Sequence, residues 1–119
     1  MLRRNEPSLV FLPLGGVGEI GMNCALYGFG PEGDRRWIMV DCGITFGDAK
    51  TTPGVDLVFP DVSFVEEERD NLLAILITHA HEDHYGALME LWPRLRAPVY
   101  ATRFVAGLLE AKATENQRR

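Results

Sequence analysis

The stretch Thr78-His79-Ala80-His81-Glu82-Asp83-His84-Tyr85-Gly86 contains all three histidines of the chain, with an aspartate among them. Directly before it runs Leu72-Leu73-Ala74-Ile75-Leu76-Ile77, a short uninterrupted apolar segment that is typical of a buried strand. After it, Leu88, Leu91 and Trp92 recur at helical spacing. The polar cluster therefore lies where a buried strand passes into a helix, which is where α/β proteins place their chemistry.

The histidines and the aspartate have the spacing of a metal site. Residues two apart in an extended strand end point the same way, so His79 and His81 can aim two imidazoles at one ion. Asp83 and His84 lie in the turn that opens the helix and can aim at a second ion, whereas Glu82 is expected to point away. Imidazole and carboxylate groups suit zinc, with manganese or iron as alternatives. Two such ions ~3.5–4 Å apart clamp a phosphate and lower the pKa of bound water toward ~7.

Two plainer interpretations of the histidine cluster are a chance grouping on the surface and a structural zinc site. No packing requirement concentrates histidines behind a buried strand. Structural zinc sites favour cysteine-containing sets of four ligands, and Cys24 and Cys42 lie far away in the sequence. Both cysteines end or interrupt apolar segments, so we expect reduced, buried, structural thiols.

The glycine-rich segment 15–21 supports a competing hypothesis, a non-catalytic dinucleotide-binding module. Gly16, Gly18 and Gly21 match the dinucleotide fingerprint, and Asp41 follows Gly21 by about 20 residues, where the acidic residue is expected. The fingerprint requires a helix after the glycines, but residues 22–37 are interrupted by glycines and a proline. Segments 23–29 and 36–40 are better interpreted as two strands joined by a turn at 31–34.

Four blocks in order carry a resemblance to a known family: LGGVGEIGMN (14–23), VDCG (40–43), GVDLVFPD (54–61) and ITHAHEDHYGAL (77–88). Together they resemble the amino-terminal part of the bacterial ribonuclease J family, β-CASP nucleases of the metallo-β-lactamase superfamily. The resemblance covers nearly the whole chain from Leu9 onward. It implies an α/β (α+β) fold, namely the first half of an αββα sandwich. It also implies a metal-dependent ribonuclease, a 5′-to-3′ exonuclease with possible endonuclease activity, that acts in RNA processing and decay.

The resemblance assigns roles to the residues of the metal motif. His79 and His81 would hold one zinc ion, and Asp83 and His84 the other, with Asp83 also orienting the attacking hydroxide. Asp41 has two open interpretations: it holds the metal loop in place through hydrogen bonds, or it caps an ordinary turn. A different hydrolase on the same fold, acting on a thioester, lactone or β-lactam, is the alternative enzyme because the metal motif is shared.

The segment containing Gly54 and Asp56 corresponds in the resembled family to a separate hard-cation site. One backbone carbonyl and one carboxylate would suit calcium. The remaining ligands are not evident in the sequence, and an ordinary turn aspartate is the favoured interpretation of Asp56.

Length and composition bound the domain organisation. The 119 residues suffice for one small domain, and we expect residues 1–119 to be the amino-terminal part of a longer enzyme, because no fourth histidine completes the two-metal set. We therefore expect this chain alone to be inactive and to bind metal weakly. The net charge of −5 implies that a basic RNA channel lies mostly outside this chain. No membrane span or export signal is evident, so we expect a cytoplasmic enzyme that binds RNA and is a homo-oligomer at full length.

The remaining pattern predicts further elements. A first strand at 9–12 should be closed by Pro13, and a capping box of Ser63 with Glu66 should open a short helix to about Arg69. Pro93 should limit the helix that follows the metal loop, and residues 98–101 should form a strand. Thr102 is expected to cap a last helix with one apolar face, formed by Phe104, Val105, Leu108 and Leu109.

Overall fold

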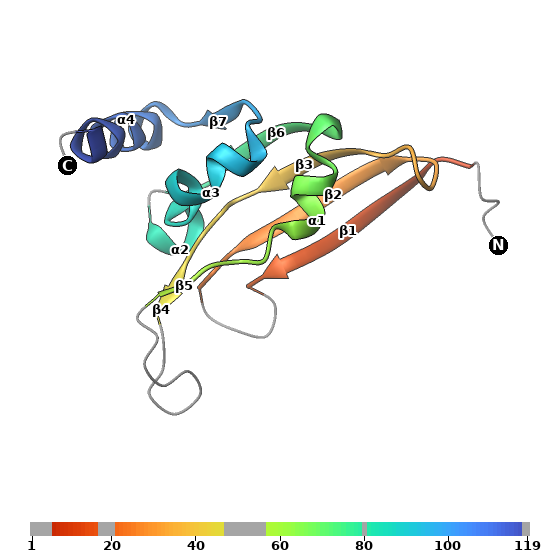
Figure 1. Cartoon of the computed structure of the whole chain (residues 1–119), viewed down its shortest axis with the longest axis horizontal. Helices are drawn as coiled ribbons and strands as arrows, with labels where there is room; N and C mark the ends of the chain where they lie inside the picture. The colour runs from red at the N-terminus through yellow and green to blue at the C-terminus, as the bar shows by residue number, and fades with distance from the viewer. Residues whose placement is uncertain (1–5, 17–20, 47–56, 80, 118–119) are drawn as a thin grey trace.

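A mixed five-stranded sheet organises the chain, and the predicted α/β class is confirmed (Figure 1). The computed structural model describes residues 6–16, 21–46, 57–79 and 81–117. The sheet has the order β1 (Ser8–Gly15), β2 (Cys24–Gly30), β3 (Arg36–Val40), β6 (Leu72–Ile77) and β7 (Val99–Ala101). A separate two-stranded ladder joins β4 (Thr45–Phe46) and β5 (Leu57–Val58). The helices are α1 (Ser63–Glu67), the 3-10 turn η1 (Arg69–Asn71), α2 (Glu82–Tyr85), α3 (Leu88–Leu95) and α4 (Arg103–Gln117).

The segment after Gly21 forms a hairpin, as the sequence predicts. Strands β2 and β3 pair in antiparallel fashion, and the N–H of Asp34 donates to the Pro31 carbonyl at 2.9 Å in the turn between them. The dinucleotide hypothesis requires a helix here, and the chain instead enters β2 at Cys24. The glycine segment is therefore not the opening of a crossover helix.

Strands β3, β6 and β7 run parallel, and this direction places the metal motif. Val40 pairs with Leu76, and Leu76 pairs with Tyr100. Because parallel strands end at the same edge of a sheet, Asp41 after β3 and Thr78 after β6 emerge side by side.

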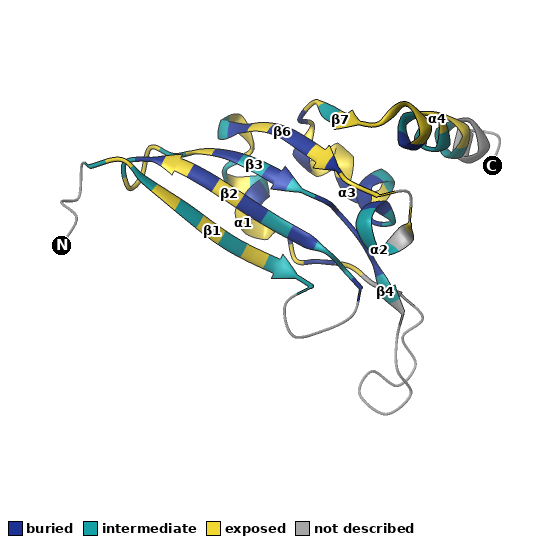
Figure 2. Ribbon diagram, turned by 180° about the vertical axis from the view of Figure 1, so that it is seen from behind, coloured by how far each residue is buried: buried dark blue, intermediate teal, exposed yellow. Residues whose placement is uncertain are grey.

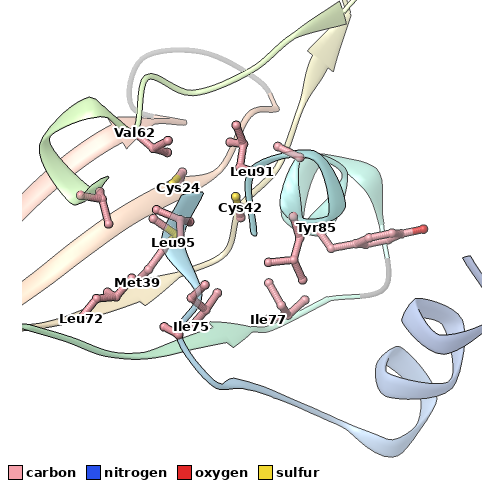
Figure 3. Close-up of a cluster of buried hydrophobic side chains, with 14 of the residues drawn as sticks. Cys24, Met39, Cys42, Val62, Leu72, Ile75, Ile77, Tyr85, Leu91 and Leu95 are labelled. Carbon is pink, nitrogen blue, oxygen red and sulfur yellow. The ribbon is translucent and has the colours of Figure 1, made fainter. Parts of the chain in front are cut away.

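The core lies between the sheet and the helices α1 and α3, which cover one face (Figures 1 and 2). Leu26, Met39 and Ile75, from the strands β2, β3 and β6, are fully buried. Leu95 of α3 is also fully buried and lies in the same cluster as Met39 and Ile75 (Figure 3). The opposite face of the sheet is open: Figure 2 shows exposed positions alternating with buried ones along β1 and β2. The cross-strand pair Phe11 and Tyr27 lies on this open face with ring centroids 5.2 Å apart.

The open face explains one wrong prediction. Strand β6 was expected to be buried throughout, but Leu73 and Leu76 are 53% and 37% exposed. Among the described residues, helices cover only one side of the sheet, so the uninterrupted apolar run of β6 is not buried on both faces.

Prolines and helix ends account for the other corrections. Pro13 does not close β1, which continues to Gly15, because an edge strand tolerates the missing N–H. Pro93 lies inside α3, which continues to Leu95. The predicted capping box is also wrong: α1 begins at Ser63 itself, and Asp61 accepts hydrogen bonds from the Ser63 N–H at 2.9 Å and from its hydroxyl at 2.6 Å.

The last helix is partly as predicted. Thr102 caps α4, its hydroxyl accepting from the Val105 N–H at 3.3 Å. Val105 is buried, but Phe104 is 71% exposed, so the expected apolar face does not include it. No helix in the described ranges is long and apolar enough to cross a membrane.

Candidate metal centre

The carboxylate of Asp41 organises the edge of the sheet where β3 and β6 end. Asp41 is only 6% exposed and has a left-handed backbone with a φ of 63°. Its Oδ1 accepts the Thr78 N–H at 2.8 Å, and its Oδ2 accepts the Thr78 hydroxyl at 2.7 Å. The same Oδ2 lies 2.8 Å from Nδ1 of His84. Three groups of the metal loop thus converge on one carboxylate, which is what the first of the two interpretations of Asp41 expects.

These contacts set the proton positions on two imidazoles. A carboxylate only accepts hydrogen bonds, so Nδ1 of His84 donates in this contact, and in the neutral imidazole Nε2 then holds the lone pair. The single hydroxyl proton of Thr78 goes to Asp41, so the Thr78 oxygen accepts the Nδ1 proton of His79 at 2.8 Å. Nε2 of His79 is therefore also left as a ligand atom. Hydrogen bonds of this kind, donated by the second ring nitrogen to an oxygen acceptor, orient metal-binding histidines.

The short helix α2 holds Asp83 and His84 beside this pair. The His81 carbonyl accepts the N–H groups of His84 at 2.9 Å and Tyr85 at 3.1 Å, which forms the turn. The turn is fastened to the end of β3, because the Cys42 N–H donates to the His84 carbonyl at 2.8 Å. Oδ2 of Asp83 then lies 3.7 Å from Nε2 of His84, and both side chains are partly exposed.

The structure brings together part of the predicted ligand set. The rings of His79 and His84 lie with centroids 4.3 Å apart, and ligand atoms of Asp41, His79 and His84 all lie within 4.8 Å of one another. His81 is exposed and does not belong to this group, and Ala80 before it lies outside the described residues. The assignment of His79 with His81 to one ion and Asp83 with His84 to another stays a prediction.

The residues present fit a divalent metal by the chemistry of their donors. Two imidazoles each expose Nε2 with the other nitrogen occupied, and the Asp83 carboxylate is near. Neutral imidazole with carboxylate is a donor set for zinc or manganese. Both oxygens of Asp41 already accept hydrogen bonds, so Asp41 suits orientation of the ligands better than direct coordination.

Two predicted features lie outside the described residues. Gly54 and Asp56, the candidates for a separate calcium site, fall in the segment 47–56, and Gly18 of the glycine fingerprint falls in 17–20. The calcium site therefore stays a prediction.

Both cysteines are free and buried in the hydrophobic core, as expected (Figure 3). A hydrogen bond with Cys42, together with burial and the nearby charge of Asp41, raises the pKa of the Cys24 thiol far above its usual range. Burial and the raised pKa both favour the protonated thiol of Cys24 over the thiolate that nucleophilic attack and metal binding require.

The sequence of the chain places this arrangement in a known class. The sequence model of the metallo-beta-lactamase superfamily matches residues 18–118, so the chain belongs to that superfamily. The five-stranded sheet with helices on one face is consistent with part of its fold.

Curated relatives narrow the comparison to one group of nucleases. The chain is 67% identical to a protein named ribonuclease J from Sinorhizobium meliloti over 107 residues, which is 90% of this chain and 19% of that protein. It is 38% identical to ribonuclease J of Helicobacter pylori over 112 residues, covering 94% of this chain and 16% of the relative. Ribonuclease J 2 of Staphylococcus aureus is 34% identical over 110 residues, which is 92% of this chain and 19% of the relative. The chain thus spans less than a fifth of the length of these relatives, and the predicted family resemblance is confirmed over that part.

The sequence analysis missed the role of Thr78. Its signal was a hydroxyl residue directly before the first histidine and directly after a strand. Its contact with Asp41 depends on the parallel pairing of β3 with β6, which the sequence does not specify.

Proposed function

We propose that this chain supplies part of the metal centre of a ribonuclease that hydrolyses RNA phosphodiesters, as a 5′-to-3′ exonuclease with additional endonuclease activity. The observation that carries the proposal is the pair of imidazoles whose Nδ1 atoms are both occupied, leaving both Nε2 atoms as ligands. The ribonuclease J relatives, whose matches cover 90% and 94% of this chain, support the ribonuclease assignment. A hydrolase for thioesters, lactones or β-lactams has no comparable support.

Under this proposal His79 and His81 hold one zinc ion, and Asp83 and His84 hold a second, with manganese as the alternative metal. When bound, the ions supply Lewis acidity that activates water and neutralises charge on the phosphate. Asp83 is the predicted ligand of the turn that carries a carboxylate, and its side chain is 40% exposed. It can therefore also accept a hydrogen bond from a water molecule and orient that water. Asp41, through Thr78 and directly, keeps the two rings in the ligating tautomer.

The rest of the centre is proposed to come from elsewhere in a longer polypeptide. A set of four ligands is too small for two ions, and the relatives are more than five times as long as the matched region. We propose that the additional part also supplies a basic RNA-binding surface, because this chain has a net charge of −5, and that the enzyme is a cytoplasmic homo-oligomer.

The test compares two neighbouring substitutions in the longer polypeptide. His81→Ala removes a predicted ligand and should abolish cleavage of a 5′-monophosphorylated RNA while the circular dichroism spectrum is kept. Glu82→Ala is the matched control, because Glu82 is predicted to point away from the ions, and it should retain activity. Cleavage by His81→Ala at the wild-type rate would refute the assignment of this ligand. Robust metal-dependent cleavage by the 119-residue chain alone would contradict the view that its centre is incomplete.

A further inference from the structure

We propose that Asn23, together with Gly43, is a positioning residue that seats the Asp83–His84 turn and fixes the direction of the Asp83 carboxylate. The inference rests on the proposed metal centre. It assigns a role to Asn23 at the end of the glycine-rich block, which the absence of a helix after Gly21 had left without a function.

Asn23 contacts Asp83 through both its backbone and its side chain. Its backbone N–H donates to the Asp83 carbonyl at 2.8 Å, and its side-chain Nδ2 donates to the same oxygen at 3.0 Å. The same Nδ2 lies 3.5 Å from Oδ2 of the Asp83 carboxylate. One amide therefore contacts both the backbone and the side chain of a predicted ligand that is 60 residues away in the sequence.

Gly43, which follows β3, provides the second contact surface for the Asp83–His84 turn. Its N–H donates to the Asn23 carbonyl at 2.9 Å, so the two residues form one unit. A Cβ on Gly43 would lie 1.8 Å from the carbonyl oxygen of Asp83 and 2.9 Å from the N–H nitrogen of His84. The turn sits directly on the backbone of Gly43, and no other residue type allows this approach.

Gly16 explains why the amide of Asn23 faces the metal loop. The φ of Gly16 is +81°, and a Cβ there would lie 2.6 Å from Oδ1 of Asn23. The amide oxygen thus occupies the space that a side chain at position 16 would fill, while the amide nitrogen faces Asp83. Asn23 thus lies between Gly16, which leaves space for its amide oxygen, and Asp83, which accepts from its amide nitrogen.

A purely structural role predicts a different result from a positioning role. Asn23 is only half-buried, so water can replace its side-chain bonds, and their loss should cost the fold about 1 kcal/mol. Loss of an outer hydrogen bond to a metal ligand typically costs about 10–100-fold in metal affinity. The ligand geometry should therefore respond much more strongly than the fold.

The experiment uses the 119-residue chain with Co²⁺ as the probe, since its d–d absorption reports ligand geometry. Asn23→Ala should weaken Co²⁺ binding by about tenfold or more and change the shape of the visible spectrum. The matched control is Asn71→Ala, which also removes two side-chain hydrogen bonds, to Glu68 and Arg36, at the far end of β6. Asn71→Ala should keep the wild-type affinity and spectrum, while urea unfolding should show similar stability losses for both variants.

A second variant and a ligand control separate the two claims. Asn23→Asp keeps the side-chain size, removes the donor and places a second carboxylate beside Asp83, so it should change the spectrum even if Asn23→Ala folds poorly. Wild-type spectra for the Asn23 variants, with binding lost in Asp83→Ala, would overturn the positioning role and leave the proposed centre intact. Wild-type binding by Asp83→Ala would overturn the centre itself, and the role of Asn23 with it.

Discussion

Substitution of Asp41 should separate the stability of the metal loop from its ability to ligate. Asp41→Ala removes the acceptor for the Thr78 N–H, the Thr78 hydroxyl and the His84 ring. Hydrogen bonds to a charged group contribute about 1.5–3 kcal/mol when no water replaces them. Thr78 is exposed and the His84 side chain is 21% exposed, so we reduce this to about 1 kcal/mol for each bond. The expected loss for Asp41→Ala is about 3 kcal/mol of unfolding free energy.

Asp41→Asn should lose much less stability than Asp41→Ala. Its metal affinity should nevertheless fall by as much as that of Asp41→Ala. The amide oxygen can still accept the Thr78 N–H, so the loss should be about 1 kcal/mol. The amide nitrogen, in the place of Oδ2, donates to Nδ1 of His84 and moves the imidazole proton to Nε2, the ligand atom. Both variants should therefore bind Co²⁺ at least tenfold more weakly than the wild type.

Urea unfolding followed by circular dichroism measures the stability term, and titration with Co²⁺ measures the affinity. Asp34→Asn is the control, since its side chain is 75% exposed in the β2–β3 hairpin, and it should change neither quantity. Wild-type Co²⁺ affinity in Asp41→Asn would refute the reasoning, because the tautomer of His84 would then not depend on Asp41.

Four further predictions concern the core, the reactivity of the thiols, the pH dependence of stability and one surface ion pair. Leu26→Ala, at a fully buried position, should lower the unfolding free energy by about 3 kcal/mol in urea, whereas Leu9→Ala, at a position 73% exposed, should change it by less than about 0.5 kcal/mol. Cys24 and Cys42 should not react with a disulfide reagent at pH 8 in the folded chain, and both should react in denaturant; prompt reaction of the native thiols would contradict their burial. Because the folded pKa of Cys24 is raised, its stabilising contribution is full below the unfolded pKa of ~8.5 and declines as the pH rises above that value, which urea titrations at pH 7 and pH 10 would detect. Arg94→Ala breaks an exposed ion pair between α3 and α1 and should cost less than about 1 kcal/mol, with the difference falling in 1 M salt.

Local patterns were sufficient to predict most strands. The apolar run 72–77 and the hairpin around the turn 31–34 are determined by nearby residues, and both were found where expected. Predictions that depended on neighbours outside the local pattern were wrong. Pro93 was expected to end a helix that instead continues around it, and the exposure of Leu76 depends on which face of the sheet the helices cover.

The candidate site was predictable in its residue types and only partly in its contacts. The spacing of His79, His81, Asp83 and His84 carries the chemistry in the sequence itself. Thr78 and His84 lie 37 and 43 positions after Asp41 in the sequence. The parallel pairing of β3 with β6 brings them to its carboxylate. Composition and periodicity do not encode such pairings.

The most direct test of the central claim is a crystal of this chain soaked in millimolar zinc, with anomalous diffraction recorded at the zinc edge. We expect anomalous density about 2.0–2.2 Å from Nε2 of His84 and from a carboxylate oxygen of Asp83, with a further peak at His79 and His81. Asp41 should keep its hydrogen bonds to Thr78 and His84 and should not approach the metal. Zinc bound only elsewhere, or held by Asp41 in place of Asp83, would contradict the account of this metal centre.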